Sequence, residues 1–260
     1  MIMTGITTNI RIWPRRKLAL VIGISNYDVE EQLENAENDA IDMSSVLKRI
    51  GFIIDKPKLN LKCKDMEVVL TKFKYSINSG DMVVFYFAGH GLQWEDQNFL
   101  LPKDYVHNKD TTLQNRAIHV QSYLNAFNGQ NPFATIFLLD CCRFNYQRND
   151  ELTKAIAVRG SFIDHGSVDN LNTNSNDESL VAFACAPGAA AAEKLKTRQE
   201  RNGLFTKHLL KHIVTRDQDI ITILEAVIKG VREESNRLQK PECTSSLTRK
   251  IFLHTQVLRK

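Results

Sequence analysis

The sequence predicts an α/β fold, in which helices cover both faces of a mostly parallel central sheet. Three short apolar runs carry this prediction, because unbroken runs of this length are typical of strands buried on both faces. They are KLALVIGI at 17–24, MVVFYF at 82–87 and ATIFLL at 134–139. Stretches with helical spacing lie between them, and this alternation favours parallel strands joined by crossover helices.

The first half of the chain alternates strands and helices up to residue 139. Apolar residues recur at helical spacing over 36–50, and Gly51 provides the expected C-cap. Asp65 opens a second helix, and Pro102 stops a short strand. In order, the predicted elements are a strand at 17–24, a helix at 36–50, a strand at 52–54, a helix at 65–77, strands at 82–87 and 98–101, a helix at 119–127 and a strand at 134–139.

The second half begins with a polar stretch, rich in Asn and Asp, over residues 144–178. A connection that long inside a compact domain is usually functional or disordered, so we interpret it as a linker. After it we expect a strand at 179–185, helices at 203–214 and 220–234, and a final strand at 247–254. The predicted organisation is an N-terminal extension (1–16) followed by one domain (17–260), whose parts 17–143 and 179–260 flank the linker 144–178.

Composition excludes several classes of function. The net charge is +4, but basic and acidic residues are interleaved, so the sequence predicts no nucleic-acid partner. The longest apolar run, 18–24, is far shorter than the ~20 residues of a membrane helix, and residues 1–16 lack a signal-peptide core. Five cysteines without C-x-x-C spacing, and no EF-hand loop, predict neither a disulfide framework nor a metal or other cofactor. We therefore expect a cytoplasmic protein that does not bind membranes.

Two reactive side chains follow two of the buried strands: His90 after MVVFYF and Cys142 after ATIFLL. The carboxyl ends of parallel strands meet at one edge of a sheet, and adjacent strands lie ~5 Å apart, so both side chains could reach one substrate carbonyl. An imidazole can take the thiol proton and later protonate a leaving amine. The backbone N–H groups of Gly91 and Cys142 are candidates for an oxyanion hole. Taken singly, a histidine after a strand or a buried cysteine is usually structural.

These segments resemble the histidine and cysteine motifs of the caspase-like superfamily. FYFAGHG and LLDCCR carry the resemblance, supported by KLALVIGISNY and NGLFTKHLL, and it extends over about 17–253. The spacing of 142 − 90 = 52 residues fits, since caspases place the histidine about fifty residues before the cysteine. The resemblance implies a caspase-like three-layer sandwich and a cysteine endopeptidase that forms an acyl-enzyme. In the family the nucleophile lies two residues after the acid, which implies Cys142 rather than Cys141.

Within this superfamily, the chain is more similar to paracaspases than to Asp-specific caspases. The segment SLVAFACAPGAAAAE lacks the arginine with which those caspases hold an acidic side chain. The paracaspase pattern instead implies an acidic S1 pocket made by Asp39, Asp140 and Glu193, which would select Arg, and less well Lys, at P1. A guanidinium would relieve the repulsion among these carboxylates. The alternatives are a helix-dipole role for Asp39, a turn role for Asp140 and a solvated Glu193.

The resemblance also bears on partners and regulation. Caspase-like proteins dimerise through their last strand, so we expect a homodimer through 247–254, unless Arg249 and Lys250 guard an ordinary sheet edge. A recruitment partner or fused signalling domain is also expected. Self-cleavage would fall after a basic linker residue. The candidates are Arg148, Lys154 and Arg159. Two other functions stay open: an inactive caspase-like scaffold that acts by dimerising, and a calcium-dependent metacaspase.

Overall fold

A central sheet of seven strands forms the middle of the part of the chain that the structure describes. This computed structural model describes residues 13–94, 96–106, 113, 116–145, 178–186 and 200–256. The strand order is β11-β10-β8-β4-β1-β2, with β3 beside β1. The bounds are β1 Lys17–Gly23, β2 Ile53–Ile54, β3 Lys58–Leu59, β4 Met82–Ala88, β8 Ala134–Asp140, β10 Ser179–Phe183 and β11 Glu242–Ser245.

The three apolar runs are the centre of this sheet, as the sequence predicts. β1 pairs parallel with β4 from Lys17↔Met82 to Gly23↔Ala88, and β4 pairs parallel with β8. β8 in turn pairs parallel with β10. β11 alone is antiparallel to its neighbour. The carboxyl ends of four adjacent parallel strands therefore share one edge of the sheet.

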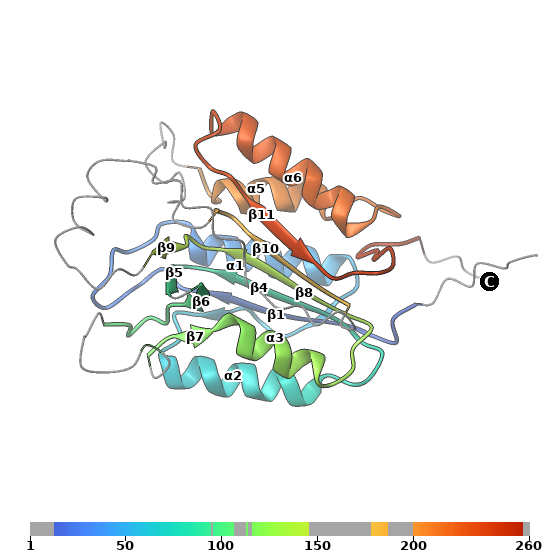
Figure 1. Ribbon diagram of the computed structural model, residues 1–260, viewed down its shortest axis with the longest axis horizontal. Helices are drawn as coiled ribbons and strands as arrows, with labels where there is room; N and C mark the ends of the chain where they lie inside the picture. The colour runs from blue at the N-terminus through green and yellow to red at the C-terminus, as the bar shows by residue number, and fades with distance from the viewer. Residues whose placement is uncertain are drawn as a thin grey trace, which may run out of the picture.

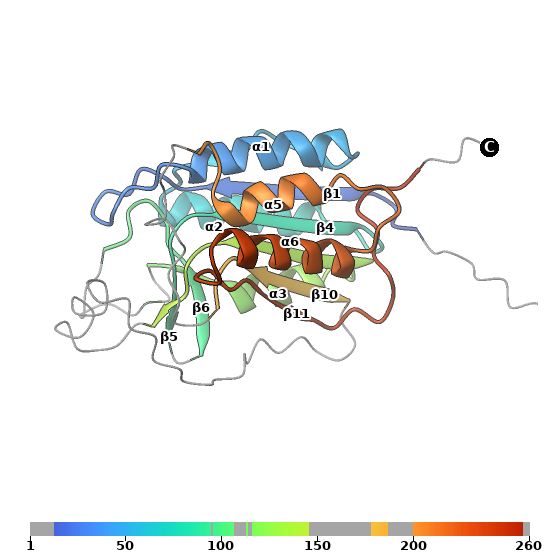
Figure 2. The ribbon, with the colours of Figure 1, turned by 90° about the horizontal axis from the view of Figure 1, so that it is seen from above.

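Helices cover both faces of the sheet, which confirms the predicted layers (Figures 1 and 2). Along β4, Val84 and Tyr86 belong to one buried cluster, whereas Val83 and Phe85 belong to the other. This alternation is the period of two of a strand covered on both sides. One face carries α1 Ala36–Arg49, α5 Leu204–His212 and α6 Ile220–Glu234, and the other carries α2 Cys63–Ser76 and α3 Val120–Asn128.

A second, smaller sheet lies directly beyond the carboxyl ends of β4 and β8. Its order is β7-β6-β5-β9. Its strands are β5 Gly91–Trp94, β6 Gln97–Leu100, β7 Ile118–His119 and β9 Phe144–Asn145. Only β6 corresponds to a predicted strand. Because β5 begins one residue after His90, and β9 begins two residues after Cys142, this sheet fixes the chain on the far side of both residues.

The predicted final strand at 247–254 is wrong. The strand that ends the sheet is β11, at Glu242–Ser245, and the predicted segment holds only an isolated bridge between Asp219 and Phe252. Ile251 and Leu253, whose alternation suggested a strand, are instead buried in the core that α5 and α6 cover. The sequence of β11, ECTS, contains no large apolar residue, so its pattern gave no strand signal.

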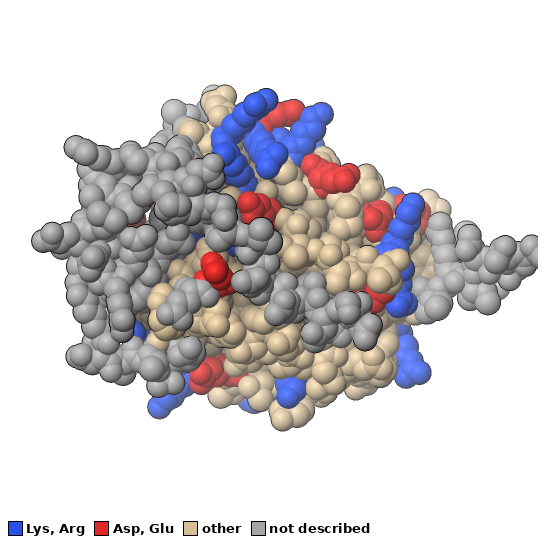
Figure 3. Space-filling view, viewed as in Figure 1, with Lys and Arg blue, Asp and Glu red and all other residues tan. Residues whose placement is uncertain are grey.

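The surface is mixed in charge, as expected from the sequence. On the face drawn in Figure 3, acidic and basic side chains are interspersed. Within the described ranges no helix combines the length and apolar character needed to span a bilayer. All five cysteines lie in these ranges and are free thiols.

Candidate active site

The strand register brings His90 and Cys142 to the same edge of the sheet. Ala88 at the end of β4 pairs with Asp140 at the end of β8, and the N–H of Gly89 donates to the Asp140 carbonyl at 3.2 Å. His90 and Cys142 each come two residues beyond this pair. The two side chains predicted to act on one amide thus follow adjacent, hydrogen-bonded strand tips.

The hydrogen bonds of His90 decide which ring nitrogen can act as a base. Its Nε2 lies 2.7 Å from the carbonyl oxygen of Glu31. A carbonyl only accepts, so Nε2 must carry the proton and donate it. In the neutral ring the lone pair is then on Nδ1. Nδ1 is the atom left to take a proton from a thiol.

Tyr27 holds His90 in place through a hydrogen bond and a ring contact. The backbone N–H of His90 donates to the Tyr27 hydroxyl at 2.7 Å, and this hydroxyl donates to the Leu101 carbonyl at 3.2 Å. The two rings are 4.5 Å apart between centroids. A Cβ at Gly89 would come within 2.7 Å of the same hydroxyl, so glycine is needed for this close approach. Tyr27 ends the motif KLALVIGISNY but was not among the site residues predicted from the sequence.

The neighbouring cysteines Cys141 and Cys142 lie in different surroundings. Cys141 is buried in the core that α2 and α3 cover, and burial raises the pKa of its thiol well above 9.0. Cys142 is only half-buried and packs against the opposite core. The side chains thus go to opposite faces, as expected for successive residues of an extended chain. Cys142 is the thiol that a substrate can approach.

A third thiol, missed by the sequence analysis, contacts Cys142. Cys185 follows β10 and is fully buried. A hydrogen bond with Cys142, together with burial, raises the pKa of the Cys185 thiol well above 9.0. Cys185 therefore stays protonated at neutral pH.

Arg143 locks the strand ends around the cysteines. Its guanidinium is buried, donates from Nε to the Cys185 carbonyl at 3.1 Å, and pairs with Glu242 of β11 at 2.6 Å. It also lies 4.4 Å above the centroid of the Phe183 ring. One side chain thus ties the chain after β8 to β10 and β11.

Gly91 is pressed against the cysteine segment. A Cβ at this position would lie 2.7 Å from the Cys142 carbonyl oxygen and 2.8 Å from the Cys141 sulfur. Any larger residue would have to move backbone atoms, so glycine keeps the start of β5 next to the Cys142 peptide. This proximity is what the predicted oxyanion hole of Gly91 and Cys142 requires.

Two of the three predicted pocket carboxylates meet at one point. A Cβ placed on Gly203 would lie 3.1 Å from Oδ2 of Asp39 and 3.3 Å from Oδ2 of Asp140. Asp39 comes from α1 and is buried, while Asp140 ends β8 two residues before Cys142. Glu193, the third predicted carboxylate, lies outside the described residues.

Different donors hold the two carboxylates. Asp39 Oδ1 accepts from the Gly203 N–H and from Asn202 Nδ2, both at 3.0 Å. Asp140 Oδ2 accepts from the Thr206 hydroxyl at 2.5 Å and from its N–H at 3.2 Å. The buried Tyr86 hydroxyl of β4 lies 2.5 Å from the Thr206 oxygen. Because the Thr206 hydroxyl donates its proton to Asp140, Tyr86 must be the donor in this pair. Asn202, Gly203 and Thr206 lie in or beside the quoted motif NGLFTKHLL, which was their only signal in the sequence.

Burial, followed by the charge of Asp140, raises the pKa of the Asp39 carboxyl from 3.8 to about 8. The hydrogen bonds from Asn202 and Gly203 oppose this shift but do not cancel it. Asp42, one turn further along α1, behaves differently. Arg201 donates to both of its oxygens, at 2.8 and 2.9 Å, and lowers the pKa of Asp42. Asp39 is therefore mostly protonated at neutral pH, whereas Asp42 is ionised.

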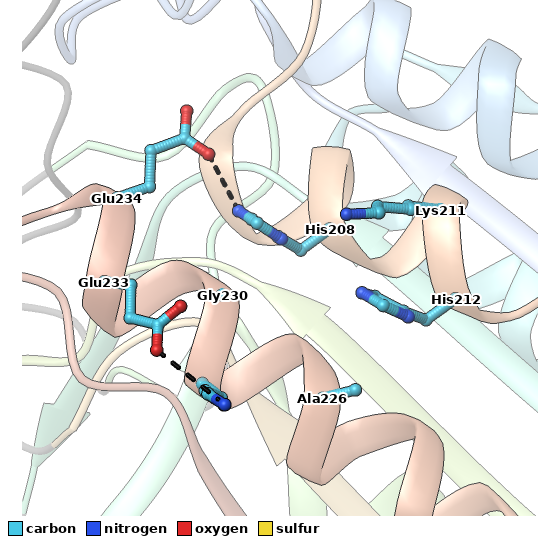
Figure 4. A pocket seen from close by; sticks show the side chains of 8 residues that line it. His208, Lys211, His212, Ala226, Gly230, Glu233 and Glu234 are labelled. Atoms are coloured by element: carbon cyan, nitrogen blue, oxygen red, sulfur yellow. Dashed lines mark hydrogen bonds and ion pairs between the residues drawn. The ribbon is translucent and has the colours of Figure 1, made fainter.

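A cavity of about 500 Å³ between α5 and α6 is separate from this site (Figure 4). His208 and His212 of α5 border it, and Nε2 of His208 lies 2.9 Å from a carboxyl oxygen of Glu234 on α6. A Cβ on Gly230 would come within 2.3 Å of the His208 ring, so glycine lets the two helices approach.

In the described part of the chain no three His, Cys, Asp or Glu side chains are arranged to hold a metal ion.

Comparison with known proteins identifies related sequences over most of the chain. A family model described as Caspase domain matches residues 16–252. The human Mucosa-associated lymphoid tissue lymphoma translocation protein 1 is 26% identical over 236 residues, which cover 90% of this chain and 26% of that protein. A probable protease of a Desulfuromonadales bacterium is 27% identical over 218 residues, covering 74% of this chain and 25% of that protein. The chain spans about a quarter of the length of these curated relatives.

Solved structures share the fold over nearly the whole chain. The crystal structure of caspase-1 from Spodoptera frugiperda superposes with a TM-score of 0.66 at 18% identity, covering 96% of this chain and 94% of that one. The structure of pro-sf-caspase-1 gives 0.65 at 18% identity, covering 95% and 96%. The predicted caspase-like sandwich is thereby confirmed.

Proposed function

The chain belongs to the caspase domain family, and from this premise we propose that it is a cysteine endopeptidase that cleaves after arginine and, less well, after lysine. Membership of the family supports a cysteine peptidase that acts on proteins. The arginine preference goes further, and one observation carries it. Asp39 and Asp140 converge beside Gly203, and Asp140 lies two residues before the proposed nucleophile, Cys142.

In the proposed mechanism, Nδ1 of His90 takes the proton of the Cys142 thiol. The sulfur then attacks the carbonyl carbon of the scissile amide, and the N–H groups of Gly91 and Cys142 stabilise the negative oxygen. The protonated imidazole gives its proton to the leaving amine, which leaves an acyl-enzyme on Cys142. Water activated by His90 hydrolyses this thioester and restores the thiol. Tyr27 and Glu31 hold the ring so that Nδ1, and not Nε2, faces the reaction.

The same proposal accounts for the unusual pocket. Two carboxylates so close together repel each other, and a buried one is poorly solvated. A guanidinium at P1 would supply both a counter-charge and donors in a forked geometry that matches carboxylates. A lysine ammonium supplies the charge without the fork. An acidic P1 residue would add a further negative charge and be rejected.

Fluorogenic peptides that differ only at P1 test the preference directly. With Arg, Lys, citrulline and Asp at P1, we expect cleavage to fall in that order. Citrulline keeps the shape of arginine without its charge and is therefore the sharpest control. The Cys142→Ala variant shows the background rate. Efficient cleavage after Asp, or equal rates for Arg and citrulline, would refute the acidic-pocket assignment.

The raised pKa of Asp39 predicts a pH dependence of substrate binding. Below about pH 8 the empty pocket holds a proton on Asp39, and an arginine favours the charged form, so binding releases this proton. KM for P1-Arg peptides should therefore fall as the pH rises from about 6 to 8. The Asp39→Asn variant has no such proton, and its KM should lose this slope. A slope that is unchanged in this variant would show that another group is responsible.

We also propose a homodimer through the sheet edge that β11 forms. β11 is the outermost strand on its side of the described sheet and pairs there with β10 alone. Such an edge offers free backbone donors and acceptors to a second copy. Sedimentation velocity should show a dimer, and a monomer at all concentrations used in activity assays would exclude this assembly.

Two alternatives to the peptidase function make different predictions. An inactive scaffold predicts no cleavage at all, and a calcium-dependent metacaspase predicts cleavage only with calcium.

A further inference from the structure

A second hollow lies at the opposite end of the sheet from His90 and Cys142. It encloses about 1010 Å³ where β1 begins and where the last described residues pass α1. In Figure 1 this end is at the right, where the dark-blue start of β1 and the red end of the described chain come together, away from β5, β6 and β9. We call it the basal hollow. Its described lining residues are Trp13, Pro14, Arg15, Arg16, Lys17, Arg49, Ile50, Gly51, Ile53, Arg216, Phe252, His254, Thr255 and Gln256.

The Arg and Lys residues of the basal hollow are not balanced by acidic residues in its described lining. It contains four arginines and one lysine, and none of the described lining residues is an Asp or a Glu. The flanking sequences, 1–12 and 257–260, contain no acid either. On the face drawn in Figure 3, by contrast, acidic and basic side chains are interspersed.

Two of the five cations are already satisfied by the protein. Arg16 makes a double hydrogen bond with Asp81, at 3.0 and 2.5 Å. Lys17 donates from Nζ to the carbonyl oxygens of Ile50 and Leu253, at 2.5 and 2.9 Å. Lys17 thereby ties the start of β1 to the end of α1, and Arg16 ties the residue before β1 to Asp81.

The other three cations, Arg15, Arg49 and Arg216, are exposed and make no ion pair with a described residue. Nε of Arg216 donates to Nε2 of His254, at 3.4 Å. Nδ1 of His254 donates to the Val214 carbonyl at 2.7 Å, which leaves Nε2 to accept the bond from Arg216. These three guanidiniums border one concave surface and form no ion pair with a described residue, and only Arg15 is near enough to Asp81 to lower the pKa of that carboxyl.

An aromatic wall adjoins these guanidiniums. The Trp13 residue is 48% exposed, and its ring lies 6.5 Å from that of Phe252, at 52°. Guanidinium groups bind phosphate oxygens through paired donors, and an exposed indole offers a face on which a nucleobase can stack. The volume also suits a ligand of nucleotide size, since small-molecule sites measure about 300 to 1,000 Å³.

We propose that the basal hollow binds a nucleoside polyphosphate. Arg15, Arg49 and Arg216 hold the phosphates, and the base stacks on Trp13. A ligand with phosphates alone would leave the aromatic wall unused, and a neutral aromatic ligand would leave the guanidiniums unpaired. The site is remote from the proposed peptidase centre and does not depend on the function proposed for that centre.

Isothermal titration of the full chain with ATP and with inorganic tripolyphosphate tests the proposal. ATP should bind, and more tightly than tripolyphosphate. Arg49→Gln combined with Arg216→Gln should weaken ATP binding at least tenfold, because both variants remove charge-assisted hydrogen bonds to the phosphates. Trp13→Leu should weaken ATP several-fold and leave tripolyphosphate unchanged. Arg232→Gln, which removes an exposed arginine of α6 outside the hollow, should leave both affinities unchanged.

Each contrary outcome overturns a defined part of the proposal. No binding of ATP, or binding that the Arg49/Arg216 double variant leaves unchanged, rejects the basal hollow as its site. Equal affinity for ATP and tripolyphosphate rejects the nucleoside. The substituted arginines are exposed, so the variants should fold, and thermal denaturation without ligand checks this.

Discussion

Replacing Cys142 with alanine should reduce kcat/KM for a P1-Arg peptide about 10⁴-fold or more. Without the sulfur no acyl-enzyme can form, and loss of a nucleophile removes nearly all of the covalent catalysis. Substrate binding should persist, because Cys142 supplies only the attacking atom and one backbone N–H, which alanine retains. Steady-state kinetics together with peptide binding to the inactive variant would measure both effects.

The matched control is the adjacent thiol. Cys141→Ala removes a buried sulfur whose pKa is raised well above 9.0, so we expect kcat/KM to stay within about tenfold of the wild type. A small loss of stability is expected, since a core residue is shortened. If Cys141→Ala were as inactive as Cys142→Ala, the assignment of the nucleophile would have to be abandoned.

The second large effect is expected at Asp39. Asp39→Asn keeps the shape and removes the charge that a P1 guanidinium would meet. Losing one partner of a buried charge pair costs about 2–5 kcal/mol, so kcat/KM for P1-Arg peptides should fall roughly 30-fold to several thousand-fold. The fold should persist, because the empty pocket already favours a neutral side chain at this position.

Asp42→Asn provides the comparison on the same helix. Asp42 is already paired with Arg201, so neutralising it should change kcat/KM only a few-fold. The contrast between Asp39 and Asp42 separates a pocket charge from the general acidity of α1. Equal losses in the two variants, or a loss in Asp39→Asn that also affects P1-citrulline peptides equally, would argue for a merely structural Asp39.

Much of the fold could be predicted because apolar runs determine its centre. β1, β4, β8 and β10 are unbroken hydrophobic segments, and such segments are stable only between two covered faces. β11 and the small sheet could not be found in the same way. Their strands are short and partly polar, so they depend on pairing partners that the local sequence does not reveal. The alternation around Ile251 was real, but it marks two side chains buried in the core that α5 and α6 cover rather than a sheet strand.

The site was predictable only in part for a similar reason. His90 and Cys142 stand at the ends of recognisable strands, so topology alone places them together. The residues that support them come from distant parts of the chain: Tyr27 contacts His90, Thr206 holds Asp140, and Cys185 contacts Cys142. No spacing rule links such positions, because the three-dimensional packing of separate elements creates the contacts.

A crystal structure of the chain with a peptidyl-arginyl ketone inhibitor tests the central claim most directly. We predict a covalent bond from Sγ of Cys142 to the former ketone carbon, with its oxygen at the Gly91 and Cys142 N–H groups and the guanidinium between Asp39 and Asp140. Attachment to another cysteine, or a guanidinium that lies away from both carboxylates, would contradict the account.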